Sequence, residues 1–287
     1  MLLITFFTTR ERIVPTAEQK SNVKEDLADL FKNKPWVIIL VVTTLVFVTL
    51  AMKGGSYVYY FENYVSKPEL TLFIQPILDL LSSIGVNFFG ENPVSAGFGL
   101  FNAGGIIFMI VGIAFSKRLA DKYGKRDVFK VALFISTLFI IVFYFFSKNS
   151  VELMFASQIL HGFFYGLTIP LLWAMIADVA DYSEWKNNRR ATAIIFSAMM
   201  VGLKGGLSIG SALVTWILGL FSYVTKEAAI VGELLVQPES AIQGTKMLVS
   251  IFPAIPFLIA IGLLFFYEIN KTMEVKIELD LKERRKK

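Results

Sequence analysis

Long apolar runs separated by short polar connections are the main pattern along this chain. A helix needs roughly 20 mostly apolar residues to cross a bilayer. Six stretches reach that length, and we expect membrane-spanning helices at 36–64, 94–116, 128–147, 151–177, 191–222 and 243–267. The pattern predicts an all-α fold, a polytopic helical bundle embedded in a lipid bilayer over residues 36–267.

The two ends of the chain differ from this bundle. Residues 1–7 resemble the end of a preceding transmembrane helix, and residues 8–35 a cytoplasmic linker. Asn22 with Glu25 three positions later predicts a capped amphipathic helix inside the linker, the alternative being a flexible connection. Residues 268–287 are expected to form a charged cytoplasmic tail.

Residues 70–89 are also long enough to span a bilayer, but Gln75, Pro76 and Asp79 interrupt them. Polar side chains facing lipid are costly. We therefore expect an interfacial hairpin or helix on the outer side.

The distribution of charge sets the expected topology. The linker contains six Lys and Arg residues. The five connections between the expected spans contain one, five, one, three and one, in chain order, and the tail contains seven. The positive-inside rule therefore places both termini in the cytoplasm of a cell membrane, expected to be a bacterial inner membrane. Because the net charge of +5 resides in these connections, it does not indicate a nucleic-acid partner.

Lys204 lies deep within the fifth expected span, and Ser197, Ser208 and Ser211 share its face at helical spacing. A charge at that depth is usually functional. We expect this stripe to line a substrate or coupling site, the alternative being a lysine paired with a carboxylate on a neighbouring helix.

A second polar stripe, in the first span, comprises Lys53, Tyr57, Tyr60 and Tyr64. Aromatic rings with hydroxyl groups suit sugars, although an interfacial aromatic belt gives the same pattern.

A third stripe, in the fourth span, comprises His161, Tyr165 and Thr168. His161 is interpreted either as a hydrogen-bonded structural residue or as a proton relay. Gly162 and Gly166 indicate close helix packing.

Acidic and basic residues gather in two cytoplasmic connections and predict a reversible gate of ion pairs, with ordinary topogenic charge as the alternative. The gate candidates are Asp121, Arg126, Asp178, Asp181 and Arg190, with Arg118, Arg126 or Arg190 as partners for the two later aspartates. The sequence has no cysteine, phosphate-binding loop, metal-ligand spacing or nucleophile–base pair, which disfavours an enzyme.

Two of these segments resemble known motifs. Residues 121–126 resemble the D-[RK]-x-G-[RK]-[RK] loop of the major facilitator superfamily. Residues 175–206 resemble the A-D-x-x-D-Y-G-E-[WY]-K…R signature of the glycoside–pentoside–hexuronide:cation symporters, the melibiose-carrier-like family. Ser183 and Thr192 depart from it, standing where the family usually has glycine and often has glutamate.

The resemblance implies the C-terminal six-helix half of a twelve-helix transporter, with substrate bound between the halves and alternating access. Lys204 then matches a lysine that links sugar and cation binding, and Asp178, Asp181 and Arg190 match a cytoplasmic charge network. The N-terminal half is the expected partner, and it would hold the acidic site of the coupling cation, Na⁺ or H⁺. No other cofactor is expected.

Two alternatives to a sugar carrier remain at this stage. Relatives with the same signature carry lipids or other amphiphiles. The chain would otherwise be a truncated, non-transporting membrane scaffold.

Overall fold

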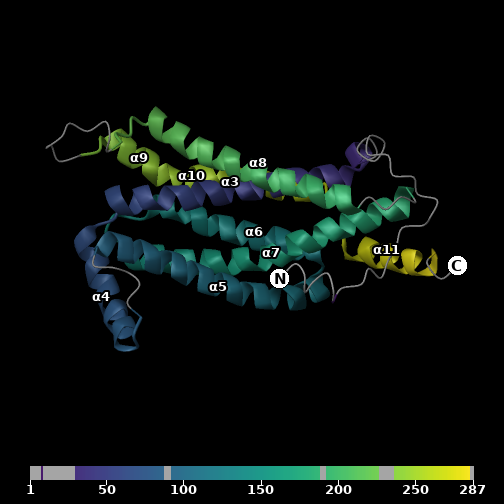
Figure 1. Cartoon of the computed structure of the whole chain (residues 1–287), viewed down its shortest axis with the longest axis horizontal. Coiled ribbons are helices and arrows are strands. Elements are labelled where there is room, and N and C mark those ends of the chain that lie inside the picture. The colour runs from purple at the N-terminus through teal and green to yellow at the C-terminus, as the bar shows by residue number, and fades with distance from the viewer. Residues whose placement is uncertain (1–7, 9–29, 87–91, 188–191, 226–235, 285–287) are drawn as a thin grey trace.

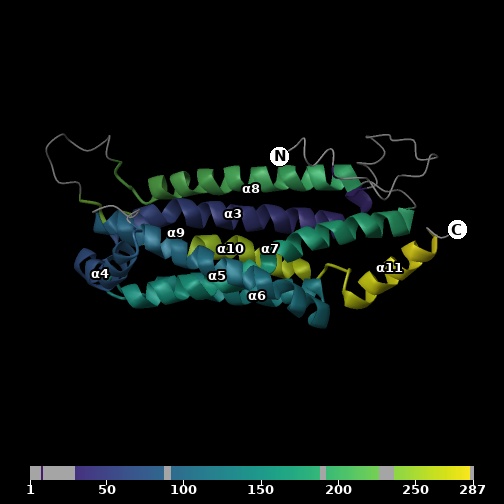
Figure 2. The same cartoon turned by 60° about the horizontal axis from the view of Figure 1, so that its bottom comes forward.

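The computed structural model describes residue 8 and residues 30–86, 92–187, 192–225 and 236–284. The regular elements of this part of the chain are all helices, and the long ones run side by side (Figures 1 and 2). The helices are α3 (Lys34–Asn63), α4 (Lys67–Ser83), α5 (Pro93–Tyr123), α6 (Lys125–Ile141), η1 (Val142–Phe145), α7 (Val151–Asn187), α8 (Thr192–Leu220), α9 (Glu239–Leu248), α10 (Ile251–Leu264) and α11 (Lys271–Arg284).

Six helical units in the described residues are long and apolar enough to cross a membrane. They are α3, α5, α6 with η1, α7, α8, and α9 with α10. Each coincides with one of the expected spans, so the prediction of an all-α membrane bundle is confirmed. The last span is two helices, because the backbone turns at Val249 and Ser250.

Local sequence explains where the spans begin and end. The side chain of Asn33 accepts a hydrogen bond from the backbone of Trp36, and Pro35 stands in the first turn of α3. Asn92 caps α5 in the same way, again followed by proline. These are the preferred residues at a helix start. Gly124, with a φ of 91°, ends α5 and lets the chain turn directly into α6.

Residues 67–83 form α4, which does not meet the length and composition of a span. Leu70 and Ile74 are buried, whereas Leu72 and Leu80 are exposed. Figure 1 shows α4 leaning away from the long helices. Of the two forms expected for this segment, the structure shows a helix.

Glycine residues allow neighbouring helices in the bundle to come into close backbone contact. A Cβ at Gly166 of α7 would collide with the carbonyl oxygen of Met109 on α5, so the predicted packing role of this position is confirmed. Gly206 of α8 approaches the backbone of α3 at Thr44 in the same manner. Small residues let backbones approach closely where lipid supplies no hydrophobic drive between helices.

The buried apolar side chains form two large clusters. One contains Trp36, Val42, Met175 and their neighbours at the end of the bundle next to α11. The other contains Tyr60, Phe61, Phe101 and their neighbours next to α4. Buried polar residues Lys53, Ser136, Gln158 and His161 belong to neither cluster.

The ends of the chain extend the sequence analysis. Residues 1–7 and nearly all of 8–35, including the expected amphipathic helix, lie outside the described residues. The tail predicted only as charged contains α11, which buries Ile277 and Leu281. In Figure 1, α11 lies at one end of the bundle and α4 at the other.

Candidate functional site

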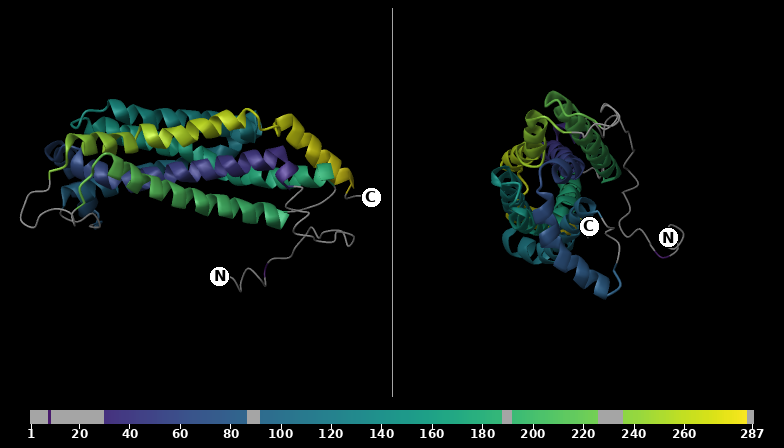
Figure 3. Two further views of the ribbon diagram at one scale, coloured as in Figure 1. Left: turned by 90° about the horizontal axis from the view of Figure 1, so that it is seen from above. Right: turned by 90° about the vertical axis from the view of Figure 1, so that its left-hand side faces the viewer.

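Lys204 lies on an exposed face of α8. Ser197 and Ser208 are exposed on the same helix, and the Ser208 hydroxyl donates to the Lys204 carbonyl at 3.0 Å. Lys204 forms no ion pair within the described part of the chain, so the alternative of a carboxylate partner finds no support there. The opposite side of α8 packs on α3, and Figures 2 and 3 show α8 at the edge of the bundle.

Lys53 has the opposite environment. It is 5% exposed and lies inside the bundle, with its ammonium nitrogen 5.3 Å from the centroid of the Tyr57 ring. A desolvated cation–π contact is worth about 2 kcal/mol, well below the cost of burying an unpaired charge. No carboxylate pairs with Lys53 among the residues that the structure describes.

Polar groups from α6 and α7 complete an interior polar layer around Lys53. The Tyr57 hydroxyl donates to Oε1 of Gln158 at 3.1 Å. His161 holds its Nδ1 against the Ser136 hydroxyl at 2.8 Å and the Ser136 carbonyl at 3.1 Å. We define the polar layer as these five residues: Lys53, Tyr57, Ser136, Gln158 and His161.

The two lysines that the sequence assigned to substrate and coupling are therefore far apart. Gly206 of α8 contacts α3 at Thr44, and Val214 contacts Gly55, so the two helices run parallel. Lys204 is then level with about residue 42 of α3, and Lys53 lies roughly 16 Å further along the axis at 1.5 Å per residue.

The other aromatic candidates pack on residues of this chain. Tyr60 is fully buried, stacks on Tyr64 at 5.0 Å and directs its hydroxyl to the sulfur of Met154. Tyr165 stacks between His161 and Phe257. Their rings stabilise the interior of the bundle in this conformation.

Charged residues gather at the end of the bundle that holds α11. The ammonium of Lys125 lies 2.6 Å from Asp178 and 2.8 Å from Glu274 of α11. Asp178 and Asp181 line a cavity of about 350 Å³ between α7 and α11. Lys125 is thus the ion-pair partner of Asp178, although the sequence analysis did not include it among the gate candidates. Its position within the loop motif at residues 121–126 could have identified it.

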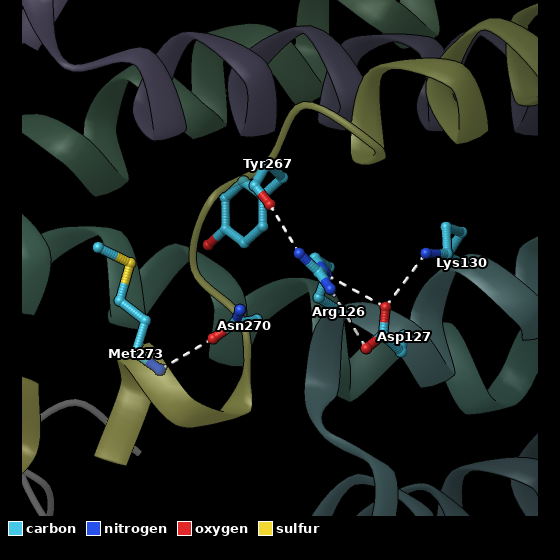
Figure 4. A network of polar contacts seen from close by, with 6 residues as sticks. All are labelled: Arg126, Asp127, Lys130, Tyr267, Asn270 and Met273. Carbon is cyan, nitrogen blue, oxygen red and sulfur yellow. Dashed lines mark hydrogen bonds and ion pairs between the residues drawn. The ribbon is translucent and has the colours of Figure 1, made fainter. Parts of the chain in front are cut away.

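Arg126 makes different contacts (Figure 4). It binds the carboxylate of Asp127 and donates to the Tyr267 carbonyl, which ties α6 to the segment after α10. Burial raises the pKa of the Tyr267 hydroxyl well above its ordinary value, so the group stays protonated and donates to the Met175 carbonyl. Arg190 lies outside the described residues.

Hydrogen bonds to α7 and α5 hold the α11 helix against the charged end of the bundle. Trp185 of α7 donates its indole N–H to Asp280 at 2.8 Å, and Arg284 donates to the Trp185 carbonyl. Lys271 donates to the carbonyl of Asp121, so this gate candidate contributes its backbone. The spacing of Ile277 and Leu281 on one helical face was the signal for this docking.

Comparison with known proteins identifies the family. A model of the MFS/sugar transport protein family matches residues 80–271. The chain belongs to this family. The matched stretch includes Lys125, Asp178 and Lys204, but it begins after Lys53 and ends before Glu274 of α11.

Individual relatives of this MFS/sugar transport chain are distant. The putative glycoside/cation symporter YagG of Escherichia coli is 27% identical over 97% of this chain and 52% of its own length. The inner membrane symporter YicJ of the same organism is 27% identical over 91% of this chain and 49% of its own length. The isoprimeverose transporter of Lactiplantibacillus pentosus is 24% identical over 99% of this chain and 52% of its own length. The chain thus spans about half the length of the curated relatives it matches.

Proposed function

We propose that this chain is the C-terminal half of a sugar:cation symporter that works by alternating access. The observation that carries the proposal is the exposed polar face of α8, with Lys204 at its centre and no partner for that lysine in the described bundle. A charge and a row of hydroxyls are too costly to face lipid. Lys204 and these hydroxyls are better explained if this face of α8 lines a substrate site shared with a second six-helix half.

The relatives support this assignment. Two of them carry the word symporter in their names, and each extends over about twice the matched length. In this arrangement, the N-terminal half supplies the remaining wall of the sugar site and the site for Na⁺ or H⁺.

The charged end of the bundle suits a gate. Lys125 bridges carboxylates on α7 and α11, and the ion pairs are only partly buried. Pairs at such a wet interface contribute about 1 kcal/mol or less each, which a transport cycle can break and reform. Asp121, Arg126, Asp178, Asp181 and Arg190 are proposed to act here together with Lys125.

The basic residues at the charged end also indicate how the bundle is oriented in the membrane. The connection between α5 and α6, the starts of α3 and α11, and the end of α7 are all rich in Lys or Arg. Lys34 and Glu268 pair at 3.4 Å, so α3 begins where α10 ends. We place this end in the cytoplasm of a bacterial cell, with the bundle in the inner membrane.

The test is cation-driven uptake of a panel of radiolabelled sugars by the transporter at its native length, in proteoliposomes. Lys204→Ala should abolish uptake driven by a Na⁺ or H⁺ gradient, whereas Lys148→Ala, in the connection between η1 and α7, should leave it unchanged. Coupled uptake that survives in Lys204→Ala contradicts the role of Lys204. Uptake of lysophospholipids in place of all sugars contradicts the substrate class.

A further inference from the structure

A groove on the outer surface of the bundle lies between α5 and α6, where both helices pack on α7. Its volume is about 380 Å³. Side chains from all three helices line it and are mainly apolar, among them Leu119, Tyr123, Val128, Val131, Phe164 and Leu167. Tyr123 and Val131 are each more than half exposed, whereas Val128 and Leu167 are buried, so the groove opens away from the bundle. Because α5 and α6 are membrane spans, an apolar groove on their outer side suits a hydrocarbon chain.

The groove runs from the charged end of the bundle into the membrane. Tyr123 is the last residue of α5, and Asp127, which also lines the groove, lies in the first turn of α6. Ile135, a further lining residue, lies roughly 12 Å beyond Asp127 along α6 at 1.5 Å per residue. Tyrosine is common at the level of lipid headgroups. The groove thus has the direction of a phospholipid acyl chain whose headgroup lies beside Tyr123 and Asp127.

Positive charges predominate where the groove reaches the membrane surface. The Asp127 carboxylate lies 3.1 Å from Nε of Arg126 and 3.1 Å from the ammonium of Lys130, so two cations share one carboxylate (Figure 4). Lys122 adds a further cation, with its ammonium 5.0 Å from the centroid of the Tyr123 ring. Lys122 forms no ion pair within the described part of the chain.

The next charges along this surface do not remove the excess. Asp121 precedes Lys122, and Lys271 places its ammonium 2.6 Å from the Asp121 carbonyl, which adds one charge of each sign. Lys125 is engaged by carboxylates of α7 and α11. The end of the groove therefore keeps a net positive charge, which complements an anionic headgroup.

From these observations, we propose that the groove binds an anionic phospholipid. One acyl chain lies between α5 and α6, and the phosphate lies beside Lys122, Arg126 and Lys130. Basic pockets between transmembrane helices on the cytoplasmic side recognise such headgroups. The inference requires that the bundle lie in a membrane, but it does not depend on sugar:cation symport.

The test measures lipid binding to the delipidated transporter at its native length by native mass spectrometry. The probes are dioleoyl phosphatidylglycerol, dioleoyl phosphatidylcholine as the zwitterionic match with the same chains, and dioleoyl phosphatidylethanolamine. Glycerol 3-phosphate serves as a free headgroup, and its binding is followed by thermal stabilisation. The wild type should bind phosphatidylglycerol about 10-fold or more tightly than phosphatidylcholine, because several basic side chains meet the phosphate. Glycerol 3-phosphate alone should not stabilise the protein.

Two pairs of variants separate the headgroup from the chain. Lys122→Gln and Lys130→Gln should each weaken phosphatidylglycerol binding about 5-fold, the effect of one basic side chain near a lipid phosphate, and leave phosphatidylcholine unchanged. Lys148→Gln makes the same change in net charge in the connection between η1 and α7 and should behave as the wild type. Val131→Trp should fill the groove and weaken binding of both lipids about 5-fold or more. Leu138→Trp is its match, because Leu138 is 47% exposed on the same helix and lies outside the lining.

Lys130→Gln removes a partner of Asp127 and lowers stability if that pair supports the fold. Lys122 has no such pair among the described residues, so Lys122→Gln carries the headgroup test by itself if Lys130→Gln melts early.

Several results would overturn the inference. Equal binding of phosphatidylglycerol and phosphatidylcholine, or phosphatidylglycerol binding that is unchanged in Lys122→Gln and Val131→Trp, removes the site. Tighter binding of phosphatidylethanolamine than of phosphatidylglycerol assigns the groove to a zwitterionic lipid. Stabilisation by glycerol 3-phosphate as strong as by the lipids assigns it to a free phosphate compound. A transporter that retains none of the lipids shows that another part of the protein covers the groove.

Discussion

Gly206→Ala should loosen the contact between α3 and α8. A Cβ at this position would lie 2.5 Å from the Thr44 carbonyl oxygen and 3.0 Å from Cβ of Phe47. Ordinary contacts begin near 3.4 Å, so the helices must separate locally by about 0.9 Å. Neither obstacle is the movable end of a side chain, and the strain cannot relax by a rotamer change.

The magnitude follows from two opposing effects. Overpacking of a tight interface costs about 1–3 kcal/mol, and a gap of this size forfeits a quarter to a half of the dispersion energy around it. Alanine regains up to about 1 kcal/mol of helix propensity. Gly205→Ala is the matched control, because it brings the same propensity gain on the same helix and its Cβ meets nothing within 4 Å.

The difference between the two variants isolates the steric cost. We expect Gly206→Ala to melt about 2–12 °C below Gly205→Ala, at roughly 2–4 °C per kcal/mol for a chain of this size. Melting is followed by size-exclusion chromatography of the detergent-solubilised protein after heating. Variants that melt within 1 °C of each other would refute close backbone packing at Gly206.

Two further predictions concern the charged end. Leu281→Ala should undock α11 at a local cost of about 2–5 kcal/mol and expose residues 271–284 to limited proteolysis, whereas Leu279→Ala, 56% exposed, should not. Lys125→Met and Asp178→Asn should each destabilise the protein, and the double variant should lose less than the sum, by up to about 1 kcal/mol. Additive melting shifts would show that this ion pair contributes nothing.

Span number and boundaries were accessible from the sequence because they depend on the length of apolar runs. The expected ends at 36–64 and 94–116 lie close to α3 and the start of α5. The break between α9 and α10 was not predicted, because the segment from 243 to 267 was treated as one span. The polar residues Gln243, Thr245 and Lys246 all precede Ser250, and this change in polarity was the available signal.

The docking of α11 was missed for a related reason. Residues 268–287 read as a charged tail because ionic residues outnumber apolar ones. The helix needs only Ile277 and Leu281 as its buried contacts, while Glu274 and Asp280 find partners on α6 and α7. Partners so distant in sequence cannot be assigned from charge pattern alone.

Lys53 and Lys204 show where sequence reasoning about membrane helices reaches its limit. Both were assigned to polar stripes by the same helical spacing, yet Lys53 is buried inside the bundle and Lys204 is exposed. Spacing fixes which residues share a face, but the rotation of that face toward a neighbour depends on packing, here on Gly206 against Thr44. Among the buried polar residues, Tyr57 bonds Gln158, and His161 bonds Ser136 of α6, within the bundle. The exposed face around Lys204 has no such partners in the described chain, and this contrast supports the proposal that α8, rather than α3, meets a further part of the transporter.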